Sequence, residues 1–106
     1  MKENLQKIFD TVSNHLLTQN EKAIEFGSCK YRTLNGLKCA AGCLIPDSAY
    51  SSDMEGRFAQ NLSYIRENFS SLECNLIEDL QIIHDCRDIT TWSSELDDLK
   101  KRYNLK

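Results

Sequence analysis

The chain has 106 residues, of which 41% are hydrophobic and 27% charged, a composition typical of one folded domain rather than of a disordered segment. Thirteen basic and sixteen acidic residues give a formal net charge of −3 without a basic stripe, so we expect no duplex nucleic acid among the partners. No apolar run reaches the roughly 18 residues of a membrane span, and the first ten residues lack the apolar core of a secretion signal, which predicts a cytoplasmic protein without a membrane partner.

The first expected element is a helix over about residues 3–18, in which apolar side chains recur at helical spacing. These apolar positions are Leu5, Ile8, Phe9, Val12 and Leu16. The stretch 19–26 that follows is polar and is interpreted as a connection.

The dipeptide Asn35-Gly36 is the strongest hairpin signal in the chain. A type I′ turn needs a positive φ at both central residues, which Asn and Gly tolerate best. A two-residue loop would pair Arg32 with Cys39 and would place Tyr31 on the opposite face of the hairpin. Because an isolated hairpin is only marginally stable in water, we expect it to pack against helices.

Helix-start signals recur after the hairpin. Ser51 or Ser52 can cap the next helix, and Ser52 with Glu55 three residues later has the pattern of a capping box. This pattern predicts a helix that continues to Phe69, although Gly56 weakens its first turn. The apolar stripe of this helix is Met54, Phe58, Leu62, Ile65 and Phe69.

Two more helices complete the expected fold. A second capping box at Ser70 and Glu73 predicts a helix through about Arg87, and a last helix begins at Thr90 or Thr91. The predicted fold class is therefore an α-rich (mainly α) single domain over residues 1–106, with four to five helices packed around one embedded β-hairpin.

The five cysteines are an odd number and argue against a complete disulfide framework, so we interpret them as free thiols used as small hydrophobes. Zinc is not favoured, because no C-x2-C spacing occurs, and we expect neither a metal ligand nor a cofactor. Cys39 or Cys43 with His84 would offer a nucleophile and a base, but nothing in the sequence brings them together. We interpret His84 as a residue at the edge of the core that donates a ring hydrogen bond to a backbone carbonyl.

A group of aromatic and charged residues remains as a candidate ligand site, with a solvated hairpin surface as the alternative. A planar ligand with a phosphate needs aromatic stacking and fork-shaped donors. In this hypothesis a tyrosine stacks, the arginines or the lysine hold phosphate, and the histidine and the aspartate contact polar edges. The candidate ligand-binding residues are Tyr31, Arg32, Lys38, Asp47, Tyr50, Arg57 and His84.

Three segments carry a resemblance to a known family. They read C-x-YR at 29–32, G-x-KCA-x-G-x-LIPD-x-x-Y-x-x-x-MEG at 36–56, and LQ-x-IHD at 80–85. Together with HLLTQ at 15–19 and Trp92, they resemble a family of small proteins encoded by tailed phages and some bacteria. The resemblance implies a phage-type accessory protein in the cytoplasm of a host cell, and it carries no activity that could be transferred.

By analogy with other small phage proteins, we expect a non-enzymatic binding module, assembled as a homo-oligomer. Its partner would be a small nucleotide-like signal that it sequesters, or a host defence protein that it inhibits. The alternatives are a small hydrolase or transferase that uses Cys39 or His84, and a pure protein–protein interaction domain.

Overall fold

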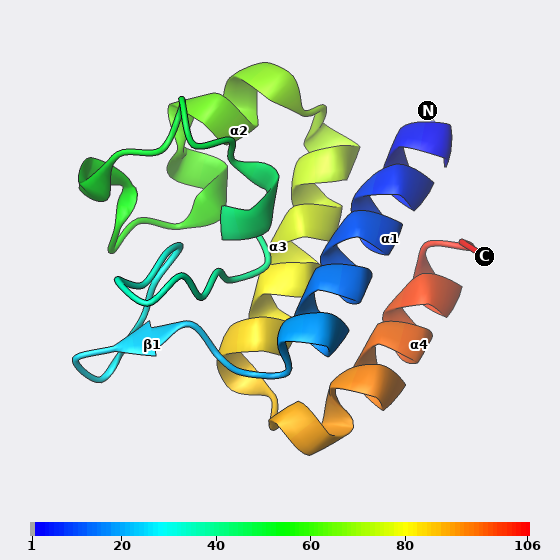
Figure 1. Ribbon diagram of the computed structural model, residues 1–106. Coiled ribbons are helices and arrows are strands. Elements are labelled where there is room, and N and C mark those ends of the chain that lie inside the picture. Colours follow the sequence, from blue (N-terminus) through cyan, green and yellow to red (C-terminus); the bar gives the residue numbers. More distant parts are fainter. Residues whose placement is uncertain (1) are drawn as a thin grey trace.

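Three helices lie side by side and form one half of the molecule (Figure 1). They are α1 (Lys2–Gln19), α3 (Ser71–Cys86) and α4 (Trp92–Arg102) in a computed structural model that describes residues 2–106. Apolar side chains from all three helices meet in a common core with at most 1% of their surface exposed. Among them are Val12, Leu16, Leu76, Leu80, Trp92 and Leu99. The helix predicted over residues 3–18 is thereby confirmed.

The capping box at the start of α3 is also confirmed. The Ser70 hydroxyl accepts from the Glu73 amide at 3.2 Å, and the Glu73 carboxylate accepts from the Ser70 amide at 2.9 Å. A single 3₁₀ turn, η4 (Ile89–Thr91), leads into α4, close to the predicted start at Thr90 or Thr91. The basic residues in the last turn of α4 suit the negative end of the helix dipole.

The two ends of the described chain are tied together (Figure 1). The side chain of Gln6 donates to the Lys106 carbonyl at 2.9 Å and accepts from the Lys106 amide at 2.8 Å. Tyr103 donates to Asp79 at 2.7 Å and links α4 to α3. None of the helices between residues 2 and 106 is both long and apolar enough to cross a membrane.

Residues 20–69 form an irregular lobe beside the helices (Figure 1). The lobe begins with a hairpin of β1 (Ile24–Glu25) and β2 (Ser28–Cys29), which pair antiparallel with Ile24 opposite Cys29. The turn residues Phe26 and Gly27 have φ values of 54° and 77°, so this turn has the positive-φ backbone expected of type I′. The α-rich domain with one embedded hairpin is confirmed, but the hairpin begins within the stretch 19–26 that was interpreted as a connection and ends at Cys29.

The turn at Asn35-Gly36 differs from the prediction by one residue. It forms only an isolated bridge between Arg32 and Lys38, and Thr33 and Leu37 close a three-residue loop. Only Gly36 of the predicted pair has a positive φ, and the Thr33 hydroxyl accepts from the Leu37 amide at 3.0 Å, which fixes the wider loop. The predicted pairing of Arg32 with Cys39 is therefore wrong, and the change of register alters which side chains face inward.

The long helix predicted from Ser52 to Phe69 is wrong as well. In its place are the 3₁₀ turns η2 (Ser52–Met54) and η3 (Ala59–Asn61) and the short helix α2 (Ser63–Asn68). A further 3₁₀ turn, η1 (Gly42–Leu44), precedes them. Gly56 has a φ of 80°, which interrupts the helix, and the Glu55 carboxylate binds elsewhere rather than closing a capping box.

Candidate functional site

A groove of about 320 Å³ lies where the lobe meets the second half of α3. One side is the segment just after β2 together with the loop 56–59, and the other side is α3. Tyr31 and Cys39 contribute to the buried floor. The side chains that give the groove its chemistry are Lys30, Arg57, Phe58, Glu78, Asp85 and Cys86.

The loop 56–59 places two of these side chains at the groove. Gly56 turns the chain with a positive φ, and the Tyr31 hydroxyl donates to the Arg57 carbonyl. Phe58 is 70% exposed, although the sequence pattern placed it in a buried stripe. An exposed aromatic ring next to an arginine gives this rim of the groove both a flat apolar surface and a cation.

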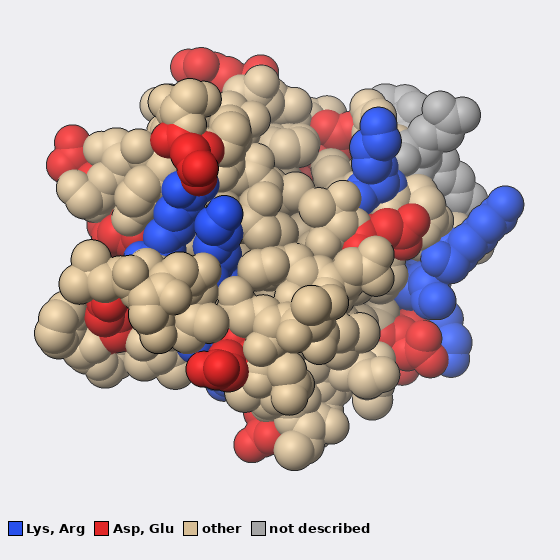
Figure 2. Space-filling view, viewed as in Figure 1, with Lys and Arg blue, Asp and Glu red and all other residues tan. Residues whose placement is uncertain are grey.

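The charges of the groove are mixed. Lys30 and Arg57 come from the lobe, whereas Glu78 and Asp85 come from α3. Burial, reinforced by the neighbouring Asp79 and Asp85 carboxylates, raises the pKa of Glu78 above its usual value. On the face of the molecule seen in Figure 2, basic and acidic side chains likewise lie next to one another.

His84 lies fully buried behind Asp85 and is held at both ring nitrogens. Nε2 accepts from the Ala23 amide at 2.9 Å, so Nδ1 carries the proton and donates to Asp85 Oδ1 at 2.6 Å. The ring also stacks on Trp92 with a centroid distance of 5.7 Å. The predicted hydrogen bond from the His84 ring to a backbone carbonyl is therefore wrong. The ring donates to the Asp85 carboxylate instead and accepts from a backbone amide.

A second group, here called the Glu55 cluster, consists of Arg32, Asp47, Tyr50 and Glu55. The Glu55 carboxylate accepts from the amides of Tyr31 and Arg32 at 2.8 and 3.2 Å and from the Tyr50 hydroxyl at 2.6 Å. These contacts fasten the loop after η2 to the strand-like segment around Tyr31. The cluster therefore holds the lobe together.

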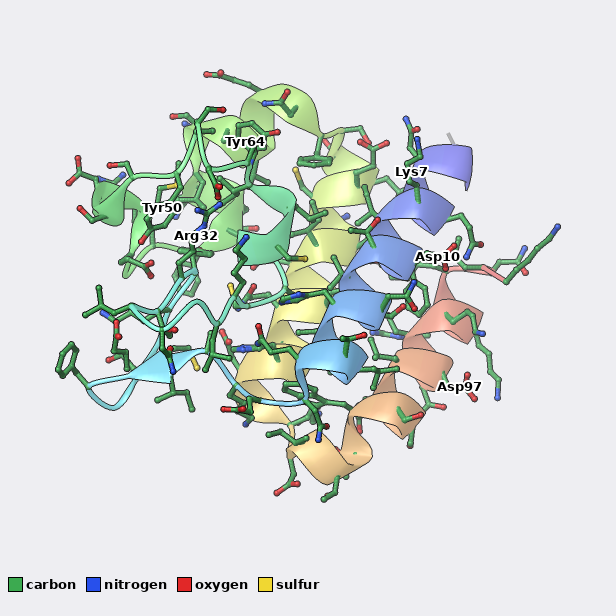
Figure 3. All side chains as sticks on the ribbon, in the orientation of Figure 1. Lys7, Asp10, Arg32, Tyr50, Tyr64 and Asp97 are labelled. Carbon is green, nitrogen blue, oxygen red and sulfur yellow. The ribbon has the colours of Figure 1, made fainter. Side chains whose placement is uncertain are left out.

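Arg32 is the centre of the Glu55 cluster and packs against Tyr50 (Figure 3), with its guanidinium carbon 4.7 Å from the ring centroid. It donates to Asp47 and to the Ile45 carbonyl, both at 2.6 Å, and its side chain is only 17% exposed. Burial and the hydrogen bond to Glu55 raise the pKa of Tyr50 to about 12. Both terminal nitrogens of Arg32 therefore have acceptors within the lobe, whereas its buried Nε has none.

The structure separates the predicted ligand residues into three places. Tyr31 and Arg57 line the groove, and His84 reaches it only through Asp85. Three others belong to the Glu55 cluster, as described above. The remaining one, Lys38, has its backbone fastened to α1, where its amide donates to Gln19 Oε1 at 3.0 Å.

Of the two thiol candidates for catalysis, Cys39 is buried and Cys43 is half-buried. Cys39 is 1% exposed and accepts from the Gly42 amide at 3.3 Å, and burial raises its pKa to about 12. Burial raises the pKa of Cys43 to about 12 as well. Since the thiolate is the reactive form, neither group is an activated nucleophile at neutral pH.

All five cysteines, each within the described residues, are free thiols, but the interpretation of all five as buried or half-buried small hydrophobes is wrong for two of them. Cys29 and Cys86 differ from the other three because they are exposed and both line the groove. Partial burial of the thiol and the adjacent Asp85 carboxylate raise the pKa of Cys29 to about 11.

Several groove residues were not among the predicted site residues. Phe58 was assigned to a helix stripe, and Lys30 and Glu78 carry no local signal because they come from elements far apart in the sequence. Gly56 directly before Arg57 and Phe58 was the one available clue, since a glycine within an apolar helical pattern often marks a break.

The fold and the groove together define a small α-helical protein with a mixed-charge groove between an irregular lobe and a helix core. Comparison of the chain with protein-family models, with curated proteins and with solved structures gave no significant match.

Proposed function

We propose that this protein is a non-enzymatic binding module and that its ligand occupies the groove between the lobe and α3. The observation that carries the proposal is the exposed Phe58 ring beside Arg57 and Lys30 at the same groove. Stacking on an aromatic ring combined with arginine or lysine donors suits a planar, phosphate-bearing molecule. The proposed ligand is accordingly nucleotide-like.

The state of the buried thiol and of the buried histidine supports binding rather than enzymatic turnover. The Cys39 thiol lies in the floor of the groove in its protonated form, and the ring nitrogens of His84 are both occupied. The side chains that remain accessible at the groove are suited to recognition. The sequence resemblance favours one biological role for such binding, in which a phage-type accessory protein sequesters a nucleotide-like signal.

The experiment is a binding titration of the full chain against a panel of mononucleotides, dinucleotides and cyclic dinucleotides, followed by calorimetry. Replacing Arg57 by Ala removes a charge-assisted hydrogen bond, so the affinity for the bound nucleotide should fall by about 10- to 100-fold. Arg66→Ala is the matched control, because Arg66 is exposed on α2 and carries the same charge. No binding by any nucleotide, or equal losses in both variants, would contradict the proposal.

Native mass spectrometry of gently purified protein supplies an independent readout. A retained mass of a few hundred daltons per chain, on the order of a nucleotide, would identify the ligand class directly. We expect the same spectrum to show a homo-oligomer.

A second candidate function is the capture of a host protein by the tips of two neighbouring turns. Phe26 and Leu34 are 88% and 89% exposed, and the two turns are joined by a hydrogen bond from the Leu34 amide to Glu25 at 2.9 Å. Exposed apolar side chains that form one contiguous patch are typical of interaction sites. Serine at both positions should then abolish a host-protein complex and leave nucleotide binding unchanged.

A further inference from the structure

Two buried side chains hold the Asp85 carboxylate in one orientation at the groove. Its Oδ1 accepts from His84 Nδ1 at 2.6 Å and from Gln81 Nε2 at 2.9 Å. The Ala23 amide donates to His84 Nε2 at 2.9 Å, which leaves the ring proton on Nδ1. The Ala41 amide donates to Gln81 Oε1 at 2.9 Å, which turns the Gln81 NH₂ group toward Asp85. Such support from behind is typical of a residue that recognises a ligand.

The second oxygen of Asp85 is the one that a ligand can use. Two hydrogen bonds to Oδ1 leave Oδ2 with the free acceptor capacity, and the Asp85 side chain is 34% exposed in the lining of the groove. The Cys29 sulfur lies within 4.8 Å of an Asp85 carboxylate oxygen. A thiol is a weak donor, so a ligand N–H group can take its place. Asp85 is therefore suited to a ligand edge that donates hydrogen bonds.

The two walls of the groove carry opposite charges that are not paired with each other. Lys30 and Arg57 lie on the lobe side, and Glu78 and Asp85 lie about two turns apart on α3. In the part of the chain that the structure describes, no ion pair joins the two walls. An anionic group is attracted to the lobe side and repelled by α3, which orients a ligand. A nucleotide should therefore place its phosphate toward Lys30 and Arg57 and its base edge toward Asp85.

The edge of guanine is the one among the common nucleobases that fits an oriented carboxylate. Guanine presents its N1–H and its 2-amino group side by side, and both donate. In adenine and cytosine the amino group lies next to a ring nitrogen that accepts, and uracil has a single N–H between two carbonyls. The groove volume of about 320 Å³ is at the lower end of the range for small-molecule sites and suits one nucleotide.

We propose that the ligand of the groove is a guanine nucleotide, with Asp85 Oδ2 accepting from the 2-amino group of the base. The inference rests on the proposed function, in which a nucleotide-like ligand occupies the groove, and adds which base that ligand carries. Phe58 supplies the stacking surface, and Lys30 and Arg57 bind the phosphate. His84 and Gln81 hold Asp85 in place and do not contact the base.

The test is a calorimetric titration of the full chain with GMP, with AMP and with inosine monophosphate, which lacks only the 2-amino group of GMP. We expect GMP to bind about 10- to 100-fold more tightly than inosine monophosphate, as for the loss of one hydrogen bond to a charged group. Equal affinities for these two, or tighter binding of AMP, would overturn the guanine assignment and leave the proposed function standing. Absence of binding by all three would also overturn it, and the wider panel of nucleotides then decides the proposed function separately.

Asp85→Asn reverses the hydrogen-bonding sense of the site. Its amide oxygen can keep the bonds from His84 and Gln81, which turns its NH₂ group to the position of Oδ2. This variant should lose affinity for GMP by about tenfold or more. It should prefer xanthosine monophosphate, which carries a carbonyl in place of the 2-amino group. Loss of structure alone would not produce this change of preference.

Asp97→Asn is the matched control, because Asp97 is 63% exposed on α4, away from the lobe (Figure 3). It should retain the preference of the unaltered protein for GMP. Far-ultraviolet circular dichroism and urea unfolding verify that each variant is folded. A folded Asp85→Asn protein that still prefers GMP to xanthosine monophosphate would overturn the proposal.

Discussion

At the residue scale, the Glu55 carboxylate joins separate segments of the lobe through three hydrogen bonds. Its carboxylate accepts from two backbone amides and one tyrosine hydroxyl that lie 5 to 24 residues away in the sequence. Each of these donors would otherwise need water or another acceptor. Glu55 therefore takes the place of the strand pairing that the segment around Tyr31 lacks on that side.

Glu55→Gln tests this role with almost no change in size. The glutamine amide keeps one acceptor oxygen but presents an NH₂ group to a donor that Glu55 had satisfied. The free energy of unfolding should therefore fall by about 1–3 kcal/mol. Urea unfolding monitored by circular dichroism measures the loss, and Glu67→Gln at an exposed position of α2 should change stability by less than about 0.5 kcal/mol. Equal effects at the two positions would remove Glu55 from its structural role.

At the element scale, the sequence predicted those helices whose stabilising contacts join residues close together in the chain. The helices α1, α3 and α4 follow from apolar spacing, and the capping box of α3 involves residues only three apart. The helix predicted from Ser52 failed because Glu55 is used by the distant amides of Tyr31 and Arg32, and no local pattern shows that competition. Such long-range use of a side chain overrides local propensity.

The candidate site likewise depends on contacts between distant residues that no local sequence pattern shows. Arg57 and Tyr31 could be selected as groove residues from their chemistry, but their neighbours Phe58 and Asp85 depend on how the lobe docks on α3. The Asn35-Gly36 turn was recognised as a turn, yet its loop length was set by the Thr33 hydroxyl. A shift of one residue then changed which side chains face inward.

Within the lobe, the 3₁₀ turn η1 packs closely against the backbone of Tyr31 through Gly42, and this contact offers an element-scale prediction. A Cβ added at Gly42 would lie 2.1 Å from the Tyr31 carbonyl oxygen, so the two backbone segments would have to separate. Gly42→Ala should therefore reduce the free energy of unfolding by more than about 4 kcal/mol, at the extreme end for a single substitution. Chemical unfolding, or loss of soluble folded protein, would measure it.

Gly56→Ala is the control for Gly42→Ala. Gly56 has a φ of 80°, but a Cβ added there would meet no atom within 4 Å, so alanine costs only the backbone strain of about 1–2 kcal/mol. A Gly42→Ala protein no less stable than Gly56→Ala would show that η1 and the Tyr31 segment can move apart at little cost.

At the scale of the whole molecule, the flattened shape of 35 × 33 × 18 Å gives each element only a few packing partners. The three long helices share one core, and the lobe is joined to them partly by buried small residues such as Cys39, Ala40 and Ala41. Thiols serve in this junction as small apolar groups. Stability of the whole fold should therefore depend on keeping these thiols protonated.

The Cys43 thiol allows this dependence to be measured. Burial raises the pKa of its thiol from 9.0 to about 12, so the folded state holds the proton more tightly than the unfolded chain does. This contribution to stability is complete below pH 9 and is lost as the pH rises toward 12, at about 1.4 kcal/mol per pH unit.

Cys43→Ser removes the titrating thiol and leaves the tyrosines and Cys39 unchanged. The measurement is urea unfolding of both proteins at pH 8, 9, 10 and 11 (about one unit apart). Above pH 9, the unaltered protein should lose more unfolding free energy than Cys43→Ser does. A difference that stays constant over this range would show that the Cys43 thiol ionises alike in the folded and unfolded states.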